Sequence, residues 1–365
     1  YMIVPNTVTP IIKLTEACNY SCYFCRYANH PQNDCVIKVE NVEHILLEAV
    51  KYNVSRGSHQ VKVIFHGGEP LLWGYDRFEK ILLYEDKLAI EYSTRFVNSI
   101  QTNGSLLNKQ WIALLKKYNF SIGISLDGPG NLNGHFGKKG NSASVTTVLA
   151  NLQMLKQENI PFGVLSVITN AHATHAQAFY EYWVEHGIEN IGLCYCYNPE
   201  DAETVSCSNL SMFLIQLFDL YFYGKAKINI REFNNAIQKK LTQKASSCTF
   251  ACRENCGHFL TIDPRMHVMF CDDYDLNKAS ALGSMQGIGF EEIIASEKYQ
   301  DMCKQSRQIV ETHCAACLVK DFCGFGCNRN DTRAGNYFCS VYKEVYLHIA
   351  KALEKINFKH QAIRP

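Results

Sequence analysis

Three cysteines lie close together in the segment TEACNYSCYFCRY, near the start of the chain. Cys18, Cys22 and Cys25 have the spacing C-x₃-C-x₂-C and follow a strand-like apolar run. A structural zinc site needs four ligands, and Cys35 and His30 lie too far along the loop for the spacing of a zinc knuckle. A [4Fe–4S] cluster held by three thiolates keeps one iron open for another ligand. The spacing therefore favours an iron–sulfur site with one open position over a zinc knuckle.

A second set of cysteines fills the last part of the chain. The run CAACLVKDFCGFGC has the spacing C-x₂-C-x₅-C-x₃-C, formed by Cys314, Cys317, Cys323 and Cys327. Cys339 follows this run, and Cys256 and Cys271 precede it, separated by fourteen residues. Five cysteines from 314 onward exceed the ligand number of one tetrahedral zinc site, which makes a zinc ribbon the weaker interpretation. The sequence predicts more than one metal centre.

Strand and helix patterns alternate along the first 230 residues. Strand patterns cover residues 9–16, 61–69, 95–104, 120–128, 162–170 and 190–198. Helical patterns lie at or near residues 41–54, 77–92, 108–118, 144–158, 172–187 and 208–222. Six such units predict a parallel sheet with helices outside, an α/β fold. Ligands in such folds bind at the carboxyl ends of the strands, so we expect the turns TEACNYS, HGGEP, QTNG and LDGP to meet there.

Composition narrows the class of protein. The 365 residues include 36 basic and 35 acidic side chains, a net charge of +1 that argues against nucleic-acid binding by bulk charge. The most apolar stretch, residues 212–224, is short and interrupted by polar residues, which argues against a membrane span. The N-terminus shows no signal segment, and 17 clustered cysteines in a reducing compartment suit metal binding. We expect a cytoplasmic protein.

In its motifs the chain resembles the radical S-adenosylmethionine (SAM) superfamily. The cysteine loop carries the resemblance, with Phe24 as the aromatic residue before the last cysteine, together with GGEP at residues 67–70. The resemblance implies a partial (β/α)6 TIM-type barrel and a [4Fe–4S] cluster on Cys18, Cys22 and Cys25. SAM then occupies the open iron, and its reductive cleavage yields a 5′-deoxyadenosyl radical.

The same resemblance assigns contacts to SAM. Gly67, Gly68 and Glu69 are expected to receive its amino group. The segments QTNG and GISLDGP supply three further candidates for the ribose and methionine portions, namely Gln101, Asn103 and Ser125. Ordinary turn chemistry at strand ends is the alternative for these segments.

The carboxyl-terminal cysteines resemble the SPASM domain, which carries two auxiliary [4Fe–4S] clusters. The resemblance assigns the first cluster to Cys256, Cys271, Cys327 and an upstream cysteine, for which we choose Cys252, with Cys248 as the other candidate. It assigns the second cluster to Cys314, Cys317, Cys323 and Cys339. If neither upstream cysteine is a ligand, the first auxiliary cluster has an open iron.

These assignments predict three domains in chain order. Residues 1–235 form the radical SAM barrel, residues 236–345 the SPASM domain with a β-hairpin at 262–271, and residues 346–365 the C-terminal helix and tail. Five positions before Cys271 the SPASM pattern has glycine, whereas this chain has Met266, so we expect a hairpin turn of another type.

Within the SPASM group the chain looks most like anaerobic sulfatase-maturing enzymes and maturases of ribosomally made peptides (RiPPs). The resemblance makes Asp272 the candidate general base, although Asp273 is adjacent and a solvated loop carboxylate is the alternative. It places Tyr27 close to substrate and SAM. Two positions depart from the sulfatase group: His66 stands where that group has a substrate-facing glutamine, and Arg26 where it has an aromatic residue.

The predicted function is oxidation of a peptide side chain. The radical takes a hydrogen atom, Asp272 accepts a proton, and the auxiliary clusters accept an electron. Because of the departures at His66 and Arg26 we favour a cyclophane or thioether crosslink, with formylglycine formation from cysteine or serine as the alternative. An iron–sulfur electron-transfer protein without SAM chemistry and a small-molecule dehydrogenase are further alternatives.

The expected partners follow from this chemistry. They are a precursor peptide or protein substrate and an electron donor of the flavodoxin or ferredoxin type. A separate leader-binding protein is a further candidate, because the 17 residues before Cys18 cannot hold a leader-binding domain. Neither nucleic acid nor a membrane is an expected partner.

Overall fold

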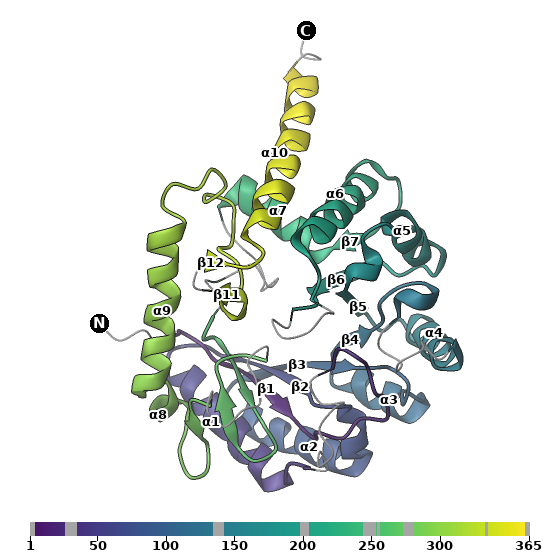
Figure 1. Cartoon of the computed structure of the whole chain (residues 1–365). Coiled ribbons are helices and arrows are strands. Elements are labelled where there is room, and N and C mark those ends of the chain that lie inside the picture. Colours follow the sequence, from purple (N-terminus) through teal and green to yellow (C-terminus); the bar gives the residue numbers. More distant parts are fainter. Residues whose placement is uncertain are drawn as a thin grey trace. The chain divides into compact units, whose positions relative to one another are not determined.

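The computed structural model describes residues 4–25, 35–133, 142–197, 204–243, 253, 256–272, 281–332 and 335–361 (Figure 1). The chain divides into two compact units, and both are discontinuous in sequence. Unit 1 consists of Tyr1–Leu126, Gly134–Phe162 and Cys256–Gln305. Unit 2 consists of Asp127–Asn133, Gly163–Asn255 and Ser306–Pro365.

The sheet of unit 1 has the strand order β10-β9-β8-β1-β2-β3-β4. These strands are β1 (Thr9–Lys13), β2 (Gln60–His66), β3 (Arg95–Thr102), β4 (Ser121–Ser125), β8 (Phe259–Ile262), β9 (His267–Met269) and β10 (Gly283–Ser284). The strands from β8 through β1 to β4 are parallel, whereas β9 and β10 are antiparallel to their neighbours. In Figure 1 the green hairpin of β8 and β9 lies beside the purple β1.

Helices pack against this sheet with their apolar faces. The helices that begin in unit 1 are α1 (Val39–Ser55), α2 (Tyr75–Glu91), α3 (Lys109–Lys117), α4 (Ser142–Gln157), α8 (Phe290–Ala295) and α9 (Glu297–His313). In α1 the buried residues Val42, Ile45, Leu46 and Ala49 recur at the spacing of one helical face. Their partners are the buried apolar side chains of β1 and β2, such as Ile12.

Unit 2 contains a smaller parallel sheet and the end of the chain. Its strands are β5 (Phe162–Ile168), β6 (Asn190–Tyr195) and β7 (Asn229–Ile230), with a separate two-stranded ribbon of β11 (Asp331–Thr332) and β12 (Gly335–Asn336). Its helices are α5 (Ala176–Glu185), α6 (Cys207–Tyr223), α7 (Arg231–Thr242) and α10 (Cys339–Gln361). The short 3₁₀ turns of the chain are η1 (Pro70–Trp73), η2 (Gly130–Leu132), η3 (Asn170–His172) and η5 (Asn328–Asn330). Helix α10 packs along α6.

The predicted α/β fold is confirmed. Each of the six expected strands and six expected helices is present within a few residues of its predicted bounds, and so are the hairpin and the C-terminal helix. The sequence analysis missed β7 and α7, and it missed that β8 continues the sheet of unit 1 by pairing with β1. The three contiguous domains remain a prediction from the order of the motifs.

We expected a different turn type in the hairpin because Met266 replaces glycine. This expectation is wrong for the backbone conformation of Met266. Met266 takes the left-handed conformation that glycine favours, with φ of 69°. Asp263 supports this conformation, because its Oδ1 accepts hydrogen bonds of 2.8 Å from the backbone N–H groups of Arg265 and His267. Burial of the Met266 side chain adds apolar packing, so the turn keeps a glycine-like shape without glycine.

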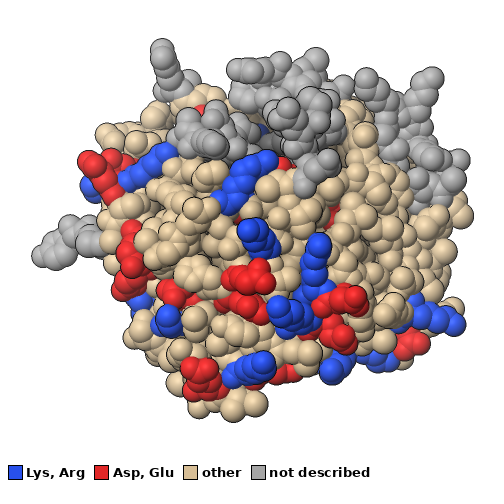
Figure 2. Space-filling model, turned by 90° about the horizontal axis from the view of Figure 1, so that it is seen from below, with Lys and Arg blue, Asp and Glu red and all other residues tan. Residues whose placement is uncertain are grey.

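The sequence analysis also made predictions about helix hydropathy and about surface charge. None of the helices in the described ranges is long and apolar enough to cross a membrane. Figure 2 shows Lys and Arg mixed with Asp and Glu on the visible face, as the near-zero net charge leads one to expect.

Candidate functional site

The first cysteine of the loop, Cys18, lies in unit 1, five residues after the end of β1. Cys18 Sγ accepts N–H hydrogen bonds from the Tyr20 backbone at 3.5 Å and from Asn103 Nδ2 at 3.8 Å. The Cys25 N–H donates to the Cys22 carbonyl at 3.0 Å, which closes the turn between these two cysteines. Cys18 as a residue is exposed, but partial desolvation of its sulfur raises the pKa of the thiol, and the nearby Glu69 and Cys25 add to this shift.

The donor set of this loop fits an iron–sulfur cluster. Three thiols lie on one short loop, and N–H donors point at the sulfur of Cys18, as they do around cluster thiolates. Over the described ranges, no three His, Cys, Asp or Glu side chains are placed to share one metal ion. The ligands of a [4Fe–4S] cluster bind different irons and do not need to meet at one point.

Two glycines attach the loop to the end of β2. The Gly68 N–H donates to the Thr15 carbonyl at 2.7 Å, and the Glu69 N–H donates to the Ala17 carbonyl at 2.8 Å. A Cβ atom on Gly68 would lie 2.2 Å from the Ala17 oxygen, and one on Gly67 would lie 2.5 Å from the Thr15 oxygen. The sequence analysis assigned these glycines to SAM binding, and the structure adds a second reason for glycine, which is close approach to the chain's own backbone.

Glu69 connects this turn to the end of β3. Its carboxylate accepts hydrogen bonds from the Leu71 N–H at 3.0 Å, the Thr102 hydroxyl at 2.7 Å and the Asn103 N–H at 2.8 Å. Burial raises the pKa of Glu69 to about 7, although these hydrogen bonds oppose the shift. Asn103 in turn donates to Asn19 and to Cys18, so Glu69, Asn103 and the cysteine loop form one network.

Gln101 and Ser125 meet at the ends of β3 and β4. Gln101 Nε2 donates to Ser125 Oγ at 3.0 Å. Gly123 makes room for this contact, because a Cβ atom there would lie 2.1 Å from the Gln101 Oε1. The described SAM-binding candidates of unit 1 therefore lie in two hydrogen-bonded groups at the carboxyl ends of β2, β3 and β4.

Asp272, the candidate base, follows β9 and lies against β1 and β2. It forms an ion pair with Lys13 Nζ through Oδ1, and its Oδ2 lies 3.6 Å from His66 Nε2. Lys13 Nζ is also 3.3 Å from His66 Nδ1. Arg265, in the turn of the same hairpin, forms an ion pair with Glu16 at the start of the cysteine loop. The hairpin thus brings Asp272 to His66 within the unit that carries the loop.

His66 is held in its neutral form. Burial and the Lys13 ammonium lower its pKa to about 4, and Asp272 opposes the shift. Lys13 was missed by the sequence analysis. Its signal was present, because a lysine stood inside a strand predicted to be buried, and a buried cation requires a partner.

The comparisons with known proteins agree with this geometry. The family model described as the Radical SAM superfamily matches residues 12–173, which contain the cysteine loop, GGEP, Gln101 and Ser125. Residues 12–173 therefore carry a radical SAM domain, and the chain is an enzyme that acts by radical SAM chemistry. It uses SAM and the [4Fe–4S] cluster that binds SAM.

Two curated relatives match this radical SAM enzyme along most of its length. The cysteine-type anaerobic sulfatase-maturating enzyme of Clostridium perfringens (strain 13 / Type A) is 27% identical over 351 residues, which cover 91% of this chain and 93% of the relative. The serine-type enzyme of Klebsiella aerogenes is 25% identical over 357 residues, which cover 93% of this chain and 84% of the relative.

A solved structure shows the same fold. Native anSMEcpe with bound AdoMet and the Cp18Cys peptide has a TM-score of 0.82 at 24% identity, over 96% of this chain and 98% of that chain. This likeness confirms the predicted partial barrel followed by a cysteine-rich region.

Unit 2 of the radical SAM enzyme brings a separate set of cysteines together. The thiols that interact electrostatically are Cys314, Cys317, Cys323 and Cys339. Burial, with a smaller contribution from the other three thiols, raises the pKa of Cys323 to about 12, although a hydrogen bond from the Phe325 backbone opposes the shift. The Phe325 N–H donates to Cys323 Sγ at 3.3 Å, from a residue with a φ of 65°. A buried thiol with this pKa stays protonated at neutral pH unless a metal binds the thiolate.

The structure describes only some of the other predicted cluster ligands and site residues. Cys256 and Cys271 belong to unit 1 and Cys327 to unit 2. Cys252, Cys248, Tyr27, Arg26 and Asp273 lie outside the described residues. Their roles stay predictions from the resemblance.

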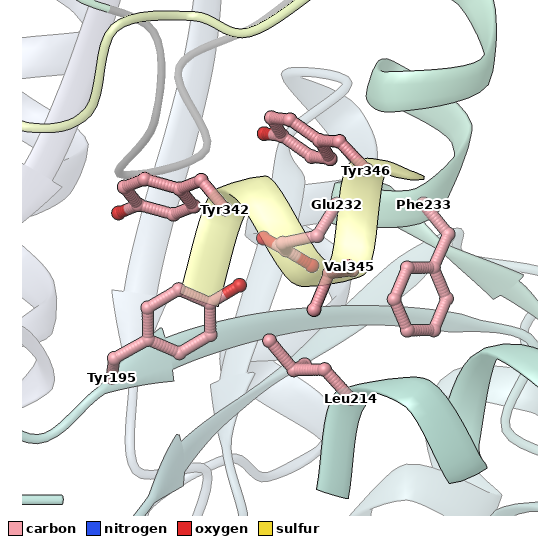
Figure 3. A pocket seen from close by; sticks show the side chains of 7 residues that line it. All are labelled: Tyr195, Leu214, Glu232, Phe233, Tyr342, Val345 and Tyr346. Atoms are coloured by element: carbon pink, nitrogen blue, oxygen red, sulfur yellow. The ribbon is translucent and has the colours of Figure 1, made fainter. Parts of the chain in front are cut away.

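A small cavity inside unit 2 is not a substrate site (Figure 3). Side chains from β6, α6, α7 and α10 line it, namely Tyr195, Leu214, Glu232, Phe233, Tyr342, Val345 and Tyr346. Its volume of about 20 Å³ has room for one water molecule and excludes a peptide side chain or SAM. Burial raises the pKa values of Tyr195 and Tyr342, so both phenols stay protonated at neutral pH.

Proposed function

We propose that this radical SAM enzyme oxidises a cysteine or serine side chain in a peptide or protein substrate to formylglycine. The observation that carries the proposal is the group formed by Asp272, His66 and Lys13, which lies in the same unit as the cysteine loop. The matches to cysteine-type and serine-type anaerobic sulfatase-maturating enzymes along nine-tenths of the chain support it.

The chain's own residues divide the work between binding and proton transfer. Cys18, Cys22 and Cys25 would hold the cluster, and the network around Glu69 and Asn103 would position SAM. Bound there, SAM supplies the 5′-deoxyadenosyl radical that removes a hydrogen atom from the substrate side chain. Asp272 accepts the proton that leaves the substrate, because its carboxylate is 34% exposed and faces His66.

Oxidation of –CH₂–OH to the aldehyde removes two electrons and two protons in total. Oxidation of –CH₂–SH removes the same number and gives a thioaldehyde, which water hydrolyses to the aldehyde with release of hydrogen sulfide. One electron and one proton leave together as the hydrogen atom, and Asp272 receives the second proton. The second electron needs an acceptor. The four clustered cysteines of unit 2 would hold an auxiliary [4Fe–4S] cluster that supplies one-electron chemistry. The first auxiliary cluster remains assigned by resemblance, as does an external electron donor.

This proposal reverses the order of the two outcomes predicted from sequence. The crosslink was favoured because His66 and Arg26 depart from the sulfatase group. The full-length matches to sulfatase-maturating enzymes favour the formylglycine alternative instead. At His66 the neutral imidazole retains one N–H group, which keeps a hydrogen-bond donor at a position where the sulfatase group has an amide.

The test is anaerobic incubation of reconstituted enzyme, SAM and reductant with peptides encoded beside the gene. Each peptide is made in cysteine, serine and alanine forms. We expect the cysteine form to exchange sulfur for oxygen and lose two hydrogens, and the product to react with a hydrazide probe for aldehydes. Loss of two hydrogens with sulfur retained and no hydrazide adduct would show a crosslink and overturn the proposal.

The role of Asp272 is tested in the same assay. In Asp272→Asn, 5′-deoxyadenosine formation should continue, while aldehyde product falls by about 10²–10⁴-fold, the usual contribution of a positioned base. Asp301→Asn, at an exposed position of α9, is the matched control. Normal product from Asp272→Asn would place the base elsewhere.

A further inference from the structure

Lys13 is a cation inside a fully buried strand. It is the last residue of β1, its side chain is 4% exposed, and it stands in register with His66 of β2. Burying an ammonium group is costly unless it is paired and hydrogen-bonded. An apolar residue at this position would avoid that cost, so the charge calls for an explanation in terms of its contacts.

The Lys13 ammonium contacts two side chains that the proposed function uses. It forms an ion pair with Asp272 Oδ1, and it lies 3.3 Å from His66 Nδ1. These side chains come from different parts of unit 1, because His66 ends β2 and Asp272 follows β9. Lys13 therefore sets the positions of both relative to β1.

The contacts of His66 define which ring nitrogen carries the hydrogen. The Gly67 N–H donates to Nδ1 at 2.8 Å, and the Lys13 ammonium also points at Nδ1. The Gly67 carbonyl lies 3.2 Å from the same nitrogen, but a hydrogen on Nδ1 would clash with both donors. The neutral ring consequently carries its hydrogen on Nε2, which faces Asp272 Oδ2 at 3.6 Å.

We propose that Lys13 is a positioning residue for the reaction: it anchors the Asp272 carboxylate and holds His66 as a neutral imidazole with its hydrogen on Nε2. In this arrangement His66 donates a hydrogen bond to the substrate sulfur or oxygen, and Asp272 accepts the proton from that atom. The bond from the substrate heteroatom to hydrogen breaks, and its electron pair remains on the substrate. The inference rests on the proposed function.

The electrostatics support this assignment. The charged groups that face His66 are Lys13 from β1 and Asp272 after β9, beside the Gly67 backbone. A protonated His66 would place a second cation 3.3 Å from the Lys13 ammonium. Burial and Lys13 together lower the pKa of His66 to about 4, so the imidazole stays neutral through the range in which enzymes are assayed. Removing the ammonium should raise the pKa of His66, although burial, the larger cause, continues to lower it.

A purely structural lysine would behave differently. It would affect folding and the loading of clusters, but replacing it would leave the titration of His66 and the pH dependence of product formation unchanged. The test therefore uses Lys13→Met and, as a second neutral variant in case methionine impairs folding, Lys13→Gln. Lys62→Met, at an exposed position of β2, is the matched control. Iron content and 5′-deoxyadenosine formation without peptide establish that each variant is loaded.

The first readout is exchange of the histidine C2 hydrogen for deuterium, followed residue by residue with mass spectrometry across pH 5–8 on the full-length reconstituted enzyme. We expect His66 to show no titration in wild type or Lys62→Met, and a midpoint that moves up into this pH range in the Lys13 variants. This readout does not depend on the identity of the substrate. An unchanged His66 titration in loaded Lys13 variants would overturn the inference.

The second readout is the pH profile of aldehyde formation. We expect the Lys13 variants to lose about tenfold or more in product rate, with an acid limb that follows the raised pKa of His66 and that wild type lacks. In the double variant Lys13→Met/His66→Gln the side chain at position 66 cannot titrate, so the acid limb should vanish. A Lys13→Met profile that matches wild type would contradict the inference. Absence of aldehyde from wild type would contradict only the proposed function, since the histidine titration would still decide the role of Lys13.

Discussion

The two groups of cysteines differ in number and in surroundings. The loop of unit 1 has three thiols, of which Cys18 is exposed, and it lies among polar side chains such as Asn103. The group in unit 2 has four thiols, of which Cys323 is buried, beside the buried Tyr342. A three-thiol site in polar surroundings suits a cluster that exchanges a ligand, whereas four thiols grouped around a buried cysteine suit a closed cluster that passes electrons. Under the proposed function, the loop of unit 1 is the place of SAM chemistry and the cysteine group of unit 2 is the place of electron storage.

The largest expected effect comes from removing a ligand of the open site. Cys22→Ala should reduce 5′-deoxyadenosine formation to background, because the cluster would lose one of its three thiolates. Iron analysis and electron paramagnetic resonance with and without SAM measure the loss. Cys35→Ala is the control, since Cys35 stands outside the C-x₃-C-x₂-C spacing. Retained SAM cleavage in Cys22→Ala would remove the distinction between the two sites.

Removing a ligand of the closed site should have a different result. Cys323→Ala should lose one cluster's content of iron and all aldehyde product, while SAM cleavage without peptide continues. Unfolding temperature should also fall, because metal binding contributes folding free energy. Cys207→Ala, in the same unit, is the control. Loss of SAM cleavage in a folded Cys323→Ala would show that the two sites do not act separately.

A smaller effect is expected at the turn that supports the open site. Gly68→Ala places a Cβ atom 2.2 Å from the Ala17 oxygen, so the cysteine loop must shift. We expect a loss of about 1–3 kcal/mol in stability, typical of overpacking, and a higher KM for SAM. Gly163→Ala is the control, because its Cβ would meet Asn190 at an ordinary 3.6 Å. Equal KM values for the two variants would show that the turn does not position SAM.

The smallest effect on product formation is expected from changing a buried carboxyl group. The buried carboxyls also differ between the two units. Glu85 of unit 1 accepts a hydrogen bond of 2.6 Å from the neutral Asn98, whereas Glu232 of unit 2 pairs with Arg231. Burial raises the pKa of Glu85 to about 8. Between about pH 4.5 and 8 the folded state keeps this proton and the unfolded state releases it, so stability falls as pH rises.

Glu85→Gln should flatten this dependence, because glutamine has no proton to lose. Unfolding temperatures measured across pH 5–8 should decline less in the variant than in wild type, because one retained proton changes stability by at most about 1.4 kcal/mol for each pH unit. Glu291→Gln, at an exposed position, is the control. An identical decline in wild type and Glu85→Gln would exclude Glu85 as the titrating group.

Much of the fold was predictable because its signals are local. Strand and helix periodicity set the six strand–helix units, and the Gly-Gly turn and the cysteine spacings identified the superfamily. The pairing of β8 with β1 was not predictable, because a parallel edge between residues about 250 positions apart leaves no local pattern. Met266 misled the prediction for a similar reason, since the Asp263 hydrogen bonds that support its left-handed backbone are a property of the folded turn.

By itself, the sequence determined the chemistry that is available: three thiols with an open cluster corner, a second cysteine set, and Asp272 after Cys271. Only the tertiary structure decided which side chains act on one another. It placed a lysine from β1 between His66 and Asp272, which are separated by more than 200 residues in the chain. Charge interactions depend on distance and burial, and neither is encoded in sequence spacing once the partners lie on different elements. The state of His66 is consequently a property of the fold.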